Sequence, residues 1–144
     1  NEYQTMVLAA AKRNNRHVGF LSMDLNHFKN INDTYGHNVG DLVLVETARV
    51  LAENTRIEEA VFRLGGDEFL VIMPEMEDRT GLNYALERLT SSFENQFHLA
   101  DYPAKIAVSI GTALFPEDGD NIDALLQIAD EQMYADKKKQ KMEG

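Results

Sequence analysis

The sequence predicts an α+β fold, arranged as an α/β sandwich in which helices cover a central, mostly antiparallel sheet. Two observations support this class. Segments with apolar residues at helical spacing alternate along the chain with short β-prone runs. In addition, the glycine pair Gly65-Gly66 separates two of those runs, as a tight hairpin requires. The chain should therefore contain strands that pair locally and helices that pack on their faces.

The first part of the chain predicts a helix, a buried strand and a second helix. Tyr3 to Asn14 has apolar residues at helical spacing and contains no glycine or proline. His17 to Leu25 is apolar on both faces, which is typical of a central strand. Phe28 to Gly36 is mixed and predicts a short helix or a turn. A longer helix is expected from Val39 to Asn54, with a buried stripe of Val43, Leu44, Thr47, Ala48 and Leu51.

The middle of the chain predicts a β-hairpin. Ala60 to Leu64 and Glu68 to Pro74 are both β-prone, and the glycine pair between them supplies the positive φ angles that a tight turn needs. Asp67 and Glu68 should lie at the tip of this hairpin or just past it.

The last part predicts a helix from Arg79 to Asn95, a buried strand from Lys105 to Phe115 and a closing helix from Asn121 to Lys139. No repeat, low-complexity tract or internal linker interrupts this order. Together with the hairpin, the order of elements resembles the ferredoxin-like palm of nucleotidyl transferases and cyclases. Fold alone does not establish function.

Composition narrows the class of protein. A chain of 144 residues with 44% hydrophobic content is expected to form one domain over residues 1–144. It has no cysteine, which excludes thiolate metal sites and is compatible with a cytoplasmic location. A net charge of −10 argues against nucleic acid as a partner, and no apolar run approaches the roughly 20 residues of a membrane span.

Three acidic residues are the first candidates for chemistry. Asp24 ends a buried strand, while Asp67 and Glu68 lie at the predicted hairpin tip. If the two strands are neighbours, these carboxylates converge and need a cation between them, which predicts a magnesium site. The alternative is that acids in turns are simply solvated.

Other polar residues also have structural explanations. Asn38 and Asp41 resemble a capping box at the start of a helix, and Lys137 to Lys139 could complement a helix C-terminus. His37 has no second histidine at ligand spacing, so it is a poor metal candidate. Lys29 follows the strand that carries Asp24 and is placed to meet a phosphate as a point charge.

Two blocks, taken together, resemble the GGDEF domain family. The first is Arg63-Leu64-Gly65-Gly66-Asp67-Glu68-Phe69, which looks like the family signature. The second is the segment DLNHFKNINDTYGHNVGD at residues 24–41, which resembles the family's D-x-[DN]-x-x-K-x-x-N-D-x-x-G-H-x-x-G-D pattern. Later in the chain, Ser109-Ile110-Gly111 and the segment ADEQMYADK at residues 129–137 fall where the family has a strand and a helix. The resemblance covers nearly the whole chain.

This resemblance implies a diguanylate cyclase, a GTP-dependent nucleotidyltransferase that condenses two GTP molecules into cyclic di-GMP and releases two pyrophosphates. It implies two Mg²⁺ or Mn²⁺ ions per site, held by Asp24, Asp67, the carbonyl of Leu25 and Glu68. It also implies an antiparallel homodimer, because each domain holds one GTP and the product needs two symmetric bonds. An upstream sensor or dimerisation domain would precede this chain.

The resemblance also assigns residues to the nucleotide. Asp67 or Glu68 would be the base for the ribose 3′-hydroxyl, Asn32 and a buried Asp41 would read the guanine edge, and Lys29 would assist catalysis at the phosphates. The residues expected at the nucleotide are Phe28, Lys29, Asn32, His37, Asp41, Gly65, Gly66, Lys137 and Lys141.

The sequence departs from the family pattern at three places. Asn26 replaces the second Asp of the commonest form, and Lys141 stands where the family has a phosphate-binding Arg. Arg56 and Glu59 occupy the product-inhibition motif, in which the family has Asp as the acid, so feedback binding stays open. Two alternative functions also stay open: a catalytically silent module that binds GTP or cyclic di-GMP, and a different palm-type polymerase or cyclase.

Overall fold

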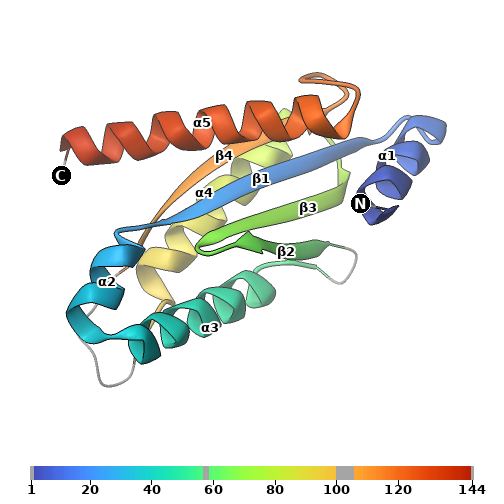
Figure 1. Cartoon of the computed structure of the whole chain (residues 1–144). Helices are drawn as coiled ribbons and strands as arrows, with labels where there is room; N and C mark the ends of the chain where they lie inside the picture. The colour runs from blue at the N-terminus through green and yellow to red at the C-terminus, as the bar shows by residue number, and fades with distance from the viewer. Residues whose placement is uncertain (1, 57–58, 100–105, 144) are drawn as a thin grey trace.

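The computed structural model describes residues 2–56, 59–99 and 106–143. Its elements are α1 (Glu2–Arg13), β1 (His17–Asn26), α2 (Phe28–Tyr35), α3 (His37–Glu53), β2 (Ala60–Gly65), β3 (Glu68–Met76), α4 (Arg79–Asn95), β4 (Ala107–Phe115) and α5 (Ile122–Glu143). The four strands form one sheet in the order β2-β3-β1-β4, and every neighbouring pair is antiparallel. Helices lie on both faces of this sheet (Figure 1). The α+β class and the antiparallel sheet predicted from the sequence are confirmed.

β1 is the centre of the sheet because it pairs with β3 on one side and with β4 on the other. Its side chains alternate between two apolar cores. Leu21, Met23 and Leu25 join the core beneath α3 and α4, whereas Val18 and Phe20 join the core beneath α1 and α5. A strand covered on both faces can be apolar throughout, which explains the uninterrupted hydrophobic run in the sequence.

Helix α5 approaches β4 most closely at Gly111. A Cβ atom at that position would overlap the backbone carbonyl of Ala129 and the backbone nitrogen of Met133, both in α5. Only glycine therefore lets the helix axis come this close to the sheet. Gly111 lies opposite Ser22 in β1, two residues before Asp24, so this contact sets the height of α5 above the functional end of the strand.

Several predicted boundaries differ from the structure. α3 begins at His37, and Gly36 is its N-cap without a side-chain hydrogen bond, so the capping box predicted for Asn38 and Asp41 is wrong. The lysines from 137 to 139 are not in the last turn, because α5 continues to Glu143. The strand predicted to start at Lys105 begins at Ala107, and Lys105 lies outside the described residues.

The segment from Phe28 to Gly36, for which the sequence predicts a short helix or a turn, forms α2 and its C-cap Gly36, whose φ angle is 93°. That positive φ angle favours glycine and lets the chain turn directly into α3. Within the described ranges, no helix combines the length and the apolar character needed to cross a membrane.

Candidate active site

The acidic residues meet where β1 ends and the hairpin turns. Asp24 of β1 lies directly opposite Glu68 of β3, and the backbone N–H of Leu25 donates to the carbonyl of Asp67 at 3.1 Å. β2 ends at Gly65 and β3 begins at Glu68, so the turn consists of Gly66 and Asp67. The two acidic segments are therefore neighbours in the sheet, and the hairpin tip is where the sequence predicted it.

Two glycines shape the hairpin tip. Gly65 and Gly66 have φ angles of 154° and 47°, and the space around the Cβ positions that they lack is open. The pairing register of β2 and β3 shifts between Arg63 and Gly65, next to the turn. The Arg63 guanidinium then donates to the carbonyl of Gly66 at 3.0 and 2.8 Å, which braces the turn from outside. The tip is fixed in shape and open to a ligand.

Asp24 is the most deeply buried of the three acids. Only 7% of its side chain is exposed, and its Oδ2 accepts a hydrogen bond from Nζ of Lys137 at 2.8 Å. With Asp67 ionised, no donor among the described residues reaches the other oxygen, Oδ1. A buried carboxylate with one unpaired oxygen costs free energy, so this atom is a candidate metal ligand.

The electrostatics of the hairpin acids indicate crowded negative charge. Burial raises the pKa of Asp67, and Asp24 raises it further through a hydrogen bond that protonated Asp67 shares with it and through charge repulsion. Burial also raises the pKa of Glu68, with further contributions from the charges of Asp24 and Asp130. The hydrogen bond to Asp24 raises the pKa of Lys137, so this ammonium stays charged at neutral pH.

These residues fit a divalent cation that is shared with a substrate. Within the described residues, no three acidic or histidine side chains are arranged as a complete metal-binding group. Magnesium, however, is usually held by one or two carboxylates together with substrate phosphates and water. Asp24 and Asp67 supply that number of carboxylates, the unpaired Oδ1 of Asp24 supplies a ligand atom, and their repulsion would be relieved by a cation.

The residues predicted to bind guanine lie on α2 and α3. The Oδ1 atom of Asn32 is buried without a partner among the described residues, and it packs against Gly40, where a Cβ atom would overlap it. Gly40 precedes Asp41, so Asn32 and Asp41 belong to one small region. Asp41 is exposed, and the expectation that it is buried is wrong because its side chain lies on the outward side of α3, whereas Val39 and Gly40 before it are buried.

The remaining predicted residues belong to α2, α3 and α5. Lys29 and His37 are exposed, and within the described part of the chain they form no hydrogen bond or ion pair with the acidic residues. Phe28 is half-buried and packs against the core. Lys141 belongs to α5, but its side chain lies outside the described part of the structure.

One contact at this site was missed by the sequence interpretation. The Asn26 side chain donates to Oε1 of Gln140 at 2.8 Å and accepts from Ser109 at 3.0 Å. It therefore joins the end of β1 to α5 and β4. The signal in the sequence that could have indicated this contact is Asn26 itself, which stands where the family commonly has Asp. An amide both donates and accepts hydrogen bonds, whereas an ionised carboxylate only accepts them.

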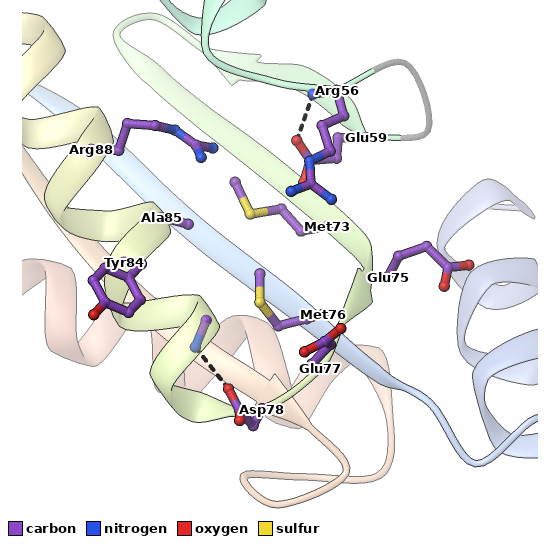
Figure 2. A pocket seen from close by; sticks show the side chains of 11 residues that line it. Arg56, Glu59, Met73, Glu75, Met76, Glu77, Asp78, Tyr84, Ala85 and Arg88 are labelled. Carbon is purple, nitrogen blue, oxygen red and sulfur yellow. Dashed lines mark hydrogen bonds between the residues drawn. The ribbon is translucent and has the colours of Figure 1, made fainter.

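A separate pocket of about 310 Å³ lies at the other end of β3 from the hairpin. Arg56 and Glu59 line it, together with Arg88 from α4 (Figure 2). The Oε1 atom of Glu59 accepts a hydrogen bond from the backbone N–H of Arg56 at 2.6 Å. The structure thus brings Arg56 and Glu59 together and adds a second arginine that the sequence interpretation did not name.

The fold is an α+β domain with an antiparallel, palm-like sheet. Its acidic residues lie at a glycine hairpin and near the end of the adjacent strand, which is the arrangement expected of a nucleotidyl cyclase domain. A family model described as "Diguanylate cyclase, GGDEF domain" matches residues 1–143. The chain belongs to the GGDEF domain family.

Relatives and solved structures agree with this assignment. The bifunctional diguanylate cyclase/cyclic di-GMP phosphodiesterase MucR of Pseudomonas aeruginosa is 38% identical over 124 residues, which are 86% of this chain and 18% of MucR. Diguanylate cyclase DosC of Escherichia coli is 38% identical over 134 residues, 92% of this chain and 29% of DosC. The chain thus spans less than a third of either protein. The GGDEF domain of YfiN from Pseudomonas aeruginosa has a TM-score of 0.88 and 33% identity, covering 93% of this chain and 78% of that one.

The raised pKa of Asp67 predicts that Asp67→Asn stabilises the metal-free protein at neutral pH. The folded state holds the proton on Asp67 more tightly than the unfolded chain does, so stability is lost as the pH rises through the raised pKa. Both states are protonated below the ordinary aspartate range, so the substitution should make little difference there. We expect a rise in Tm of about 1–3 °C at about pH 7.5, reduced by partial solvent exposure, and almost none at about pH 3.

Thermal unfolding with a chelator present measures this difference. Asp33→Asn, which removes an exposed carboxylate from α2, is the control and should show no such pH dependence. An equal Tm change for Asp67→Asn at both pH values would contradict the assigned repulsion.

Proposed function

We propose that this chain is the catalytic domain of a diguanylate cyclase, which condenses two GTP molecules into cyclic di-GMP and two pyrophosphates. The observation that carries the proposal is the convergence of Asp24, Asp67 and Glu68 at the hairpin, with one oxygen of Asp24 buried and unpaired. Membership of a family whose relatives include the diguanylate cyclase DosC supports the reaction.

Asp24 and Asp67 would hold two Mg²⁺ or Mn²⁺ ions together with the carbonyl of Leu25 and with Glu68. When bound, such ions activate the attacking hydroxyl and stabilise charge on the α-phosphate and its leaving group. Asp67 or Glu68 would accept the proton of the ribose 3′-hydroxyl. Burial and repulsion raise the pKa of both carboxyls, which moves them toward the range of a useful general base.

Selection of GTP over ATP would depend on Asn32 and Asp41. Guanine presents N1–H and N2–H donors, whereas adenine presents an acceptor at N1. The carboxylate of Asp41 can accept those donors, and Asn32 lies beside it across Gly40. Lys29 and Lys137 would each place a positive point charge beside the phosphates. Such local charges matter because the chain as a whole carries a net charge of −10 and would repel a nucleotide triphosphate. Phe28, His37 and Lys141 complete the proposed nucleotide site.

Turnover would require two copies of the chain. One nucleotide per domain and a product with two symmetric bonds imply a two-fold antiparallel encounter of two sites. The relatives MucR and DosC are much longer than this chain, so a sensor or dimerisation segment in the whole protein would bring the copies together.

The direct test is cyclase activity of the chain fused to a dimeric coiled coil. With GTP and Mg²⁺ we expect cyclic di-GMP, detected by chromatography, and no cyclic product from ATP. Asp67→Ala and Asp24→Ala should each lower turnover at least about a hundredfold, because they remove proposed metal ligands. Asp123→Asn removes an exposed acid from the other end of α5 and should leave turnover unchanged.

Two outcomes of this assay would contradict the proposal. Bound GTP without pyrophosphate release would favour the catalytically silent module, and equal use of ATP would favour a different palm-type enzyme. Near-normal folding of the alanine variants, checked by circular dichroism, separates loss of chemistry from loss of structure.

We further propose that the pocket lined by Arg56, Glu59 and Arg88 binds cyclic di-GMP as a feedback site. Arg88 lines the pocket with a guanidinium that donates to the carbonyl of Asn54 at 3.0 Å and has further N–H groups for a phosphate, and the carboxylate of Glu59 can accept from guanine. The pocket lies away from the hairpin, so product bound there would leave the acidic residues accessible.

Calorimetric titration with cyclic di-GMP tests this pocket. Arg88→Ala should weaken binding about tenfold, because one charged hydrogen-bonding partner is lost. Arg13→Ala, which removes an exposed arginine from the end of α1, should leave binding unchanged. Equal binding by the Arg88 variant, or none by the unaltered chain, would refute the assignment.

A further inference from the structure

The contact between Lys137 and Asp24 places a protein cation on a proposed metal ligand. Nζ of Lys137 lies 2.8 Å from Oδ2 of Asp24, whose side chain is only 7% exposed. The ammonium group therefore supplies the positive charge that a divalent ion would otherwise supply to this carboxylate. Without a positive charge beside it, an ionised carboxylate buried this deeply would destabilise the folded state.

We propose that Lys137 is a resident counter-ion of Asp24 that competes with the divalent metal until nucleotide phosphates draw it away. This inference rests on the proposed function and deepens it, because it assigns Lys137 a role before substrate arrives. Binding of the metal and of GTP is then cooperative. The phosphates draw Lys137 away from Asp24, which leaves the carboxylate to the metal, and the metal in turn releases Lys137 for the phosphates.

The side chain of Lys137 is able to leave Asp24. It is 40% exposed, so its ammonium lies at the solvent boundary and can swing on its flexible stem without disturbing the core. Asp24 itself belongs to the central strand and cannot follow. A rigid carboxylate facing a movable cation is suited to exchange of one cation for another.

The backbone that carries Lys137 is, by contrast, fixed. Gln140, one turn later in α5, accepts from Asn26 at 2.8 Å and donates to the carbonyl of Val108 at 2.9 Å. Asp136, the preceding residue, accepts from the backbone N–H of Ile110 at 3.2 Å. These bonds hold α5 against β1 and β4, so the competition involves only movement of the lysine side chain.

Mn²⁺ binding in the absence of nucleotide tests the proposal. Lys137→Met keeps the length of the stem and removes the ammonium, so we expect its Mn²⁺ affinity, measured by electron paramagnetic resonance, to rise about tenfold or more over the unaltered chain. Lys138→Met removes the same charge from an exposed neighbouring position of α5 and should change affinity less than about twofold, because exposed charge is screened. Equal affinities for the two variants would overturn the proposal.

A measurement on the unaltered chain covers the case in which Lys137→Met does not fold. The side-chain ε-methylene signal of Lys137, assigned by comparison with Lys137→Arg, should shift in an NMR titration with Mg²⁺ alone as the ammonium is displaced. Saturation with Mg²⁺ without any change of that signal would overturn the proposal. Neither measurement involves GTP or turnover. The chain can therefore prove to be an active cyclase although Lys137 does not compete with the metal, and Lys137 can compete with the metal although the chain is not a cyclase.

Discussion

The burial of one carboxylate, Asp24, is the constraint on which the rest of the site depends. It lies in the central strand, opposite Glu68, and under α5. A charge in that position needs a partner, which Lys137 provides from a helix 113 residues away in sequence. The close contact of α5 with the sheet at Gly111 and the Asn26–Gln140 hydrogen bond keep that partner within reach.

The two acids of the hairpin are also held in an environment that is unfavourable for negative charge. Asp67 and Glu68 are less buried than Asp24, yet the pKa of each is raised by burial and by the charge of Asp24. A protein that only needed stability would place neutral or apolar side chains here. The unfavourable charge cluster is therefore understandable as a binding surface for cations and phosphates, with one strand and one turn holding the acids in place.

Much of the fold followed from the sequence because the determining signals are local. The apolar run of β1 indicated a strand buried on both faces, and Gly65-Gly66 indicated the turn that carries Asp67. Helix limits were less accurate, since Gly36 ends α2 and also caps α3, whereas Asn38 had the better capping chemistry. The sequence also could not indicate that Asp41 is exposed, because burial on α3 depends on which side of the helix meets the sheet.

The long-range contacts of the site could not be predicted from residue patterns. Asn26 and Gln140 lie 114 residues apart, and nothing local to either one points to the other. The same holds for Arg88 of α4, which lines the separate pocket together with Arg56 and donates to the carbonyl of Asn54 at 3.0 Å. The resemblance to the family identified residue types, whereas the structure identified which of them face each other.

A crystal structure of the chain with a non-hydrolysable GTP analogue and Mn²⁺ would locate the cation and Lys137 in one experiment, because Mn²⁺ is identified by its anomalous scattering. We expect an anomalous peak at the carboxylates of Asp24 and Asp67, with Nζ of Lys137 moved from Asp24 to a phosphate. A nucleotide bound with no Mn²⁺ at these carboxylates, and with the Lys137–Asp24 ion pair intact, would contradict this expectation.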